Sequence, residues 1–135
     1  MKAITILQPW AWVILYGNKD IENRVWKTEY RGKVLLHAGK NFPLDYYYYC
    51  SGYLIQEHKI LLPPYDKIPL GAIVGIADLV DCVKKSDSIW FEGPYGFVLR
   101  NVKPLEPIPC KGALNIWDVP ENIAKLVQEQ LQNIS

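Results

Sequence analysis

The sequence has few cysteines and no long apolar run. Cys50, Cys82 and Cys110 are odd in number, are widely spaced and form no Cys-x-x-Cys pair, so neither a disulfide framework nor a cysteine-rich zinc site is expected. Reduced thiols in a cytoplasmic protein are the simpler interpretation. The most apolar stretches, Ala3–Tyr16 and Leu70–Val80, are shorter than the roughly 20 residues of a membrane-spanning helix. We therefore expect no membrane segment.

Neither sign of charge dominates the chain. Fifteen Lys and Arg stand against 14 Asp and Glu, a net charge of +1, which excludes a uniformly basic coat for gripping duplex nucleic acid. Residues 1–40 nevertheless hold seven basic and three acidic side chains, whereas residues 41–100 hold five and seven. An anionic partner is therefore expected at the first third of the chain. The alternative is an ordinary solvated surface.

What the chain has is apolar and aromatic material. Half of its 135 residues are hydrophobic and 13% are aromatic, with five Trp and nine Tyr. That composition excludes disorder as the main state, and the length is typical of one domain whose core needs no disulfide or metal. Because no internal repeat or linker is present, we predict a single domain over residues 1–135.

The predicted elements indicate an α+β fold. Apolar strands are expected over residues 3–7, 21–26, 33–38, 72–82 and 95–105, and helices over residues 10–16, 43–58 and about 120–133. We also expect a left-handed cap at Gly17, a helical turn near residues 86–90, and a stiff connection at Pro104, Pro107 and Pro109. Regular β-α-β alternation is missing. The pattern therefore favours a small, strongly curved sheet or barrel with helices packed outside it.

The segment Gly17–Trp26 has the most informative pattern of side chains. If residues 21–26 form a strand, Glu22, Arg24 and Trp26 share one face, each roughly 7 Å from the next. This row combines a carboxylate, a guanidinium and an indole, which is typical of a surface that recognises a ligand. Arginine meets phosphate or a carbonyl edge, tryptophan stacks, and glutamate holds the arginine or accepts a proton. The alternative is an exposed strand with an ordinary ion pair, which contributes little.

Lys19 and the two histidines are the other candidates for chemistry. Lys19 follows a helix end and a tight turn, where a lysine contacts phosphate, or acts as a base if desolvated, but more often is solvated. His37 has mixed neighbours on its strand face, which favours a hydrogen-bonded structural role. His37 and His58 are too far apart in sequence to suggest a zinc pair, and no phosphate-binding glycine loop is present. We expect neither a metal nor a cofactor.

Several motifs, in order, resemble the signature of the activating signal cointegrator homology (ASCH) domain family. The most specific block is Gln8-Pro9-Trp10-Ala11 followed by Gly17, Lys19, Glu22, Arg24, Trp26 and Arg31-Gly32. Less specific blocks follow at His37-Ala38, Gly71-Ala72-Ile73-Val74-Gly75, Asp81-Cys82, Tyr95-Gly96-Phe97, Lys111-Gly112 and Trp117. The resemblance covers roughly residues 3–118.

This resemblance implies a fold related to the PUA domain, a small β-barrel with flanking helices. It also implies that RNA or another nucleic acid binds, as a short single strand or a nucleotide, in a groove between the barrel and the first helix. The positions that match the family motif, and are therefore the expected ligand-binding residues, are Gln8, Trp10, Lys19, Glu22, Arg24, Trp26 and Arg31.

One branch of the family that the chain resembles is enzymatic. It hydrolyses N4-acetylcytidine with a lysine, a threonine three residues later and a distant glutamate. Lys19 matches the lysine, but Glu22 stands at the threonine position, and Glu92 is the nearest counterpart of the glutamate.

Two main functions therefore remain open. One is a non-catalytic RNA-binding module. The other is a small hydrolase of a modified nucleoside or an RNA phosphodiester, with Lys19 and Glu22 as base and acid. A desolvated Lys19 in a closed pocket favours the hydrolase, and a solvated Lys19 in an open groove favours the binding module. An adaptor that binds a protein through the C-terminal helix is a third interpretation, but the sequence indicates no particular protein partner.

Overall fold

The computed structural model describes residues 1–134, which form a six-stranded sheet with three α-helices and one 3-10 turn around it. The elements in chain order are β1 (Lys2–Ile6), α1 (Trp10–Tyr16), β2 (Ile21–Arg24), β3 (Gly32–Ala38), α2 (Leu44–His58), the 3-10 turn Tyr65–Lys67, β4 (Ala72–Val83), β5 (Tyr95–Pro109), β6 (Ile116–Asp118) and α3 (Glu121–Ile134). Among the helices of these residues, none is long and apolar enough to cross a bilayer.

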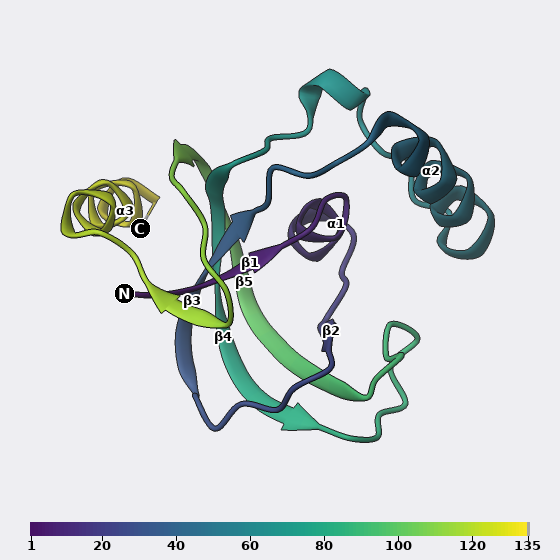
Figure 1. Cartoon of the computed structure of the whole chain (residues 1–135), viewed down its shortest axis with the longest axis horizontal. Coiled ribbons are helices and arrows are strands. Elements are labelled where there is room, and N and C mark those ends of the chain that lie inside the picture. The colour runs from purple at the N-terminus through teal and green to yellow at the C-terminus, as the bar shows by residue number, and fades with distance from the viewer. Residues whose placement is uncertain (135) are drawn as a thin grey trace.

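The strands form one curled sheet in the order β2-β5-β4-β3-β1-β6. Neighbours are antiparallel except for β1 and β3, which run parallel. Figure 1 shows the long strands β4 and β5 bending round, so that the sheet forms a half-barrel with α1 inside its curve. The predicted α+β class, with a small barrel-like sheet and flanking helices, is confirmed, although α1 lies inside the curve of the sheet and not outside it.

Both faces of the sheet are buried, and the side chains of β3 show which helix covers each face. Val34, Leu36 and Ala38 pack towards α1, whereas Leu35 packs with apolar residues of α3 on the opposite face. Alternate residues of a strand point to opposite faces, so a strand buried on both sides is a continuous apolar run. Each large aliphatic side chain buried in this way contributes roughly 1.5–3 kcal/mol. The two cores hold the sheet rigid beneath α1, and α1 leads directly into the segment that carries Lys19.

The proline-rich stretch, predicted as a stiff, non-helical connection that follows a strand over residues 95–105, lies in β5. Pro104 pairs with Gly75 and Pro109 with Ala72 of β4, across a register shift between Ile73 and Gly75. Because β2 pairs only with residues 95–98 of β5, the later part of β5 is an edge of the sheet. An edge strand tolerates proline because one side of its backbone needs no hydrogen-bond donor. The prediction of a stiff connection is therefore wrong.

The turn after α1 differs from the prediction in which residue adopts the left-handed conformation. Asn18 does so, with φ of 60°, whereas Gly17 has φ of −115°. Gly17 is needed for space instead, since a Cβ there would lie 2.9 Å from the Val13 side chain and 3.1 Å from that of Ile60. No helix forms near residues 86–90, but Ile89 and Trp90 make a single hydrogen-bonded turn, in which the Phe91 backbone N–H donates to the Ser88 carbonyl at 3.1 Å. The Ser88 hydroxyl donates to the Asp20 carboxylate.

His37 is a structural histidine, as its strand face predicts. Its side chain is buried, with Nδ1 3.2 Å from the Thr5 hydroxyl and Nε2 2.6 Å from the Cys110 carbonyl oxygen. Burial lowers the pKa of His37, against the opposing effect of the Cys110 carbonyl. The ring meets Trp117 edge to face, so it ties β3 to β6 and the segment that precedes it.

Candidate functional site

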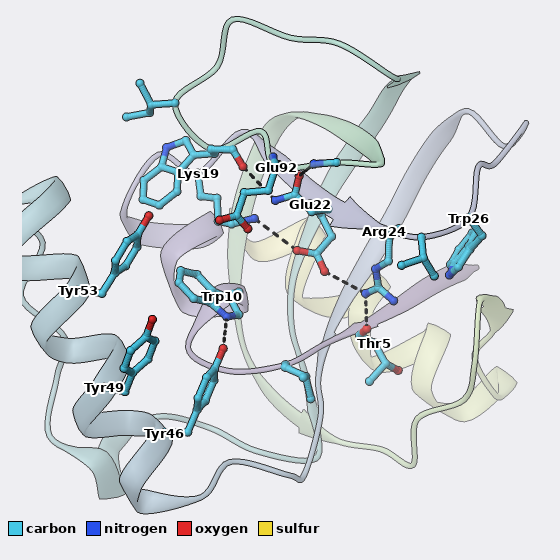
Figure 2. Close-up of a pocket in the computed structure, with 16 residues that line it drawn as sticks. Thr5, Trp10, Lys19, Glu22, Arg24, Trp26, Tyr46, Tyr49, Tyr53 and Glu92 are labelled. Atoms are coloured by element: carbon cyan, nitrogen blue, oxygen red, sulfur yellow. Dashed lines mark hydrogen bonds and ion pairs between the residues drawn. The ribbon is translucent and has the colours of Figure 1, made fainter.

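A cavity of about 600 Å³ opens to solvent between β2, α1, α2 and the loop before β5 (Figure 2). Its lining consists of Thr5, Leu7, Trp10, Lys19, Glu22, Asn23, Arg24, Val25, Trp26, Tyr46, Tyr49, Tyr53, Ile89, Trp90, Glu92 and Gly93. The volume falls within the range of sites for small molecules. The lining divides into a charged floor, an aromatic wall and an apolar rim.

The floor is a continuous row of charged groups, Lys19, Glu22 and Arg24 (Figure 2). The Lys19 ammonium lies 3.4 Å from Oε1 of Glu22, and an Arg24 Nη2 lies 3.0 Å from Oε2 of the same carboxylate. Lys19 also donates to the backbone carbonyl of Ile21. The left-handed turn at Asn18 folds Lys19 back beside β2, and the two-residue period of β2 puts Glu22 and Arg24 on one face. The strand geometry predicted for this pair is confirmed.

Arg24 bridges two strands that share no backbone ladder. Its Nη2 donates to the Thr5 carbonyl oxygen at 2.6 Å, which links β2 to β1 across the open side of the half-barrel. The guanidinium also lies 5.9 Å from the Trp26 ring centroid, a cation–π distance. Its Nε is buried and has no hydrogen-bond partner among the described residues. The arginine therefore holds the cavity floor together, and Nη1 is the nitrogen that remains for a ligand.

The charges that line the cavity balance one another, and those of the floor are partly desolvated. Lys19 is 5% exposed, and this burial lowers the pKa of its ammonium, while the carboxylates of Glu22, Glu92 and Asp20 act in the opposite direction. Two cations, Lys19 and Arg24, thus share the cavity with two carboxylates, Glu22 and Glu92. A cavity whose lining has no net charge holds a neutral ligand better than an anion.

Asn23 positions the loop that closes one side of the cavity. Its Oδ1 accepts hydrogen bonds from the backbone N–H groups of Glu92 and Gly93 at 2.8 and 3.0 Å, and its Nδ2 donates to the Trp90 carbonyl at 2.9 Å. Glu92 and Trp90 are therefore fixed by a residue of β2 itself. Sequence reasoning did not select Asn23, because an asparagine on the other face of a strand carries no obvious chemical signal.

The opposite wall is the tyrosine face of α2. Tyr46, Tyr49 and Tyr53 follow one another at spacings of three and four residues, which places them on one side of the helix. All three line the cavity (Figure 2), and Trp10 donates its indole N–H to the Tyr46 hydroxyl at 3.0 Å. Tyr47 points elsewhere and packs on Phe42. The sequence signal for this wall was the helical spacing within the tyrosine run, but nothing local showed which face meets the cavity.

The structure brings five of the seven expected ligand-binding residues to one cavity. Trp10, Lys19, Glu22, Arg24 and Trp26 line it.

The other two, Gln8 and Arg31, do not line it. The buried Gln8 side chain donates to the Pro69 carbonyl at 3.0 Å and accepts from the Trp12 backbone N–H at 2.9 Å, so it fastens the start of α1. Arg31 lies on an exposed turn, 3.7 Å from Asp81. Within residues 1–134, no group of three or more His, Cys, Asp or Glu is placed to hold a metal ion.

The half-barrel sheet, with its cavity between β2 and the first two helices, defines the class of domain, and comparison with known proteins gives the family. The ASCH domain model matches residues 4–116. The chain therefore belongs to the ASCH domain family.

Relatives and solved structures agree with this assignment. Activating signal cointegrator 1 of Homo sapiens is 28% identical and that of Mus musculus 30% identical, each over 131 residues that cover 89% of this chain. The match spans only 22% of either relative. The crystal structure of ASCH from Zymomonas mobilis superposes with a TM-score of 0.54 at 16% identity, over 94% of this chain and 93% of that one, and supports the fold alone.

Proposed function

We propose that this domain binds RNA by taking a single unpaired base into the cavity between β2 and α2. The observation that carries the proposal is the combination of a charged floor, Lys19–Glu22–Arg24, whose excess positive charge Glu92 balances within the same cavity, with aromatic side chains on two sides. Aromatic stacking holds any base, at roughly 1–3 kcal/mol per base, while the polar groups meet its edge. Membership of the ASCH family supports a nucleic-acid ligand.

The exposed rim of the cavity supports a single strand over a duplex. Leu7, Val25, Tyr49 and Ile89 are between 51% and 80% exposed around the opening. A single strand can splay its bases onto such apolar surfaces, whereas a duplex presents its phosphates outward and requires a basic face. Lys19 and Arg24 are already paired with Glu22, so they are poorly available to phosphates.

Binding of a short single-stranded RNA is expected to depend weakly on salt. Each phosphate contact with a single strand adds a slope of about −0.7 in log K against log salt concentration. Of the residues that the structure describes, the cavity lining holds only two cations, Lys19 and Arg24, so we expect a slope between about 0 and −1.5. Fluorescence anisotropy across a salt series measures it. A slope steeper than about −4, or tighter binding of duplex than of single strand, would contradict the proposal.

A hydrolase is the second candidate because Lys19 is buried with a lowered pKa beside Glu22. A lysine that loses its proton more readily is a better base or nucleophile. The open cavity and the glutamate at the position of the enzymatic branch's threonine favour binding instead. Release of cytidine from N4-acetylcytidine, followed by chromatography and lost in Lys19→Ala, would favour the hydrolase.

We also place the domain in a reducing compartment, such as the cytoplasm. Cys50, Cys82 and Cys110 are all free thiols, and burial raises the pKa of Cys50 and Cys110, so that both are held as unreactive thiols.

A further inference from the structure

The floor of the cavity has unused hydrogen-bonding capacity in a fixed order. A carboxylate accepts about four hydrogen bonds and Glu22 receives one on each oxygen, so each oxygen can accept another. Lys19 has three N–H groups and uses two, on Ile21 and Glu22. Arg24 uses Nη2 on Glu22 and Thr5, and its Nε is buried, which leaves Nη1 as the donor for a ligand. Along the row, the free groups are therefore donor, acceptor, donor.

This order matches one kind of base edge. The complement of donor–acceptor–donor is acceptor–donor–acceptor, which is the imide edge of uracil: O4, N3–H and O2. Cytosine offers a ring nitrogen acceptor between its carbonyl and its amino group, so its middle position would face the Glu22 carboxylate with a lone pair. Guanine places an amino donor beside its ring N–H, opposite a cation. Only the uracil-type edge offers each floor group a partner of the opposite kind.

We infer that the cavity selects a base with an imide edge, of the uracil type, with Glu22 accepting the N3–H and with Lys19 and Arg24 donating to the flanking carbonyls. This inference rests on the proposed function and specifies its ligand. The burial of Glu22 increases the expected selectivity for this edge. Glu22 is only 9% exposed, and a desolvated polar group that is left without a hydrogen-bond partner lowers the stability of a complex more than an exposed one does. The balanced charges fit a neutral imide better than a phosphate.

The test compares oligoribonucleotides of equal length by fluorescence anisotropy: oligouridylate, oligocytidylate, and oligouridylate methylated at N3. Methylation removes the one donor that Glu22 accepts and leaves stacking and phosphates in place. A good pair of base-edge hydrogen bonds separates right from wrong bases by about 1–3 kcal/mol, so oligouridylate should bind roughly 5- to 150-fold more tightly than the other two.

Glu22→Gln makes the same test from the protein side. A glutamine can turn an N–H towards the ring nitrogen of cytosine, so the preference for oligouridylate over oligocytidylate should fall to less than about threefold. Glu57→Gln, the same change at an exposed residue of α2 outside the cavity, should keep it. Equal affinity of the wild-type domain for all three oligomers would overturn the base preference and leave the proposed function standing. Failure to bind any of them would overturn both.

Discussion

Replacement of Glu22 by alanine is expected to lower the free energy of unfolding by about 3–5 kcal/mol, because it leaves a buried charge without its partner. Lys19 is 5% exposed and has Glu22 as its only ion-pair partner among the described residues. Arg24 would lose the same carboxylate at 3.0 Å. Denaturant unfolding followed by circular dichroism measures the change.

Glu92→Ala is the matched control. Glu92 lines the same cavity and favours the charged form of Lys19, but it is exposed, so its removal should change the free energy of unfolding by no more than about 0.5 kcal/mol. Glu22→Gln should lie between the two, since it keeps the size and one acceptor. Equal stabilities of Glu22→Ala and Glu92→Ala would contradict this, since they would mean that the ion pairs of Glu22 with Lys19 and Arg24 stabilise the fold no more than an exposed carboxylate does.

Tyr49→Ala is expected to weaken binding of a short single-stranded RNA by about tenfold or more, the loss of one stacking face worth roughly 1–3 kcal/mol. Tyr49 lines the cavity, is 70% exposed, and lies nearly parallel to Tyr46, with ring centroids 6.4 Å apart and an interplanar angle of 19°. An exposed, oriented ring of this kind can stack a base without first leaving the core. The affinity is measured by anisotropy.

Tyr48→Ala controls for the loss of an exposed tyrosine from α2. Tyr48 is 65% exposed, similar to its neighbour, but it does not line the cavity. Its removal should leave the affinity within about twofold of wild type, and both variants should remain folded by circular dichroism because neither ring is buried. An equal loss in the two variants would place the RNA on the outer face of α2 and remove the cavity from the account.

Much of the fold could be predicted because its signals are local. The apolar period of β3 and the prolines and glycines at the turns are readable along the chain. The position of the proline-rich end of β5 could not be predicted in this way. Proline is tolerated there only because β2 ends and leaves that part of β5 at the edge of the sheet. Whether a strand is central or at an edge depends on pairing between distant segments, which propensity does not contain.

The site residues that could be predicted are likewise those that lie close together in the sequence. Lys19, Glu22 and Arg24 lie within six residues, so strand alternation could bring them together. Gln8 and Arg31 belong to the same family motif, yet Gln8 fastens α1 and Arg31 lies on a turn. The tyrosine wall was missed because it depends on how α2 packs: Leu54 of α2 is buried in one cluster with Val13 of α1 and Ile21 of β2, residues more than 30 positions away in the sequence.

The indole N–H resonances of the five tryptophans test the central claim most directly. Trp10, Trp26 and Trp90 line the cavity, whereas Trp12 and Trp117 lie elsewhere. In a nitrogen–proton correlation spectrum titrated with a short oligouridylate, the first three signals should shift together with one dissociation constant, while the other two stay in place. If the oligomer binds and the largest shift belongs to Trp12 or Trp117, or if the three cavity indoles do not move, the cavity is not the binding site.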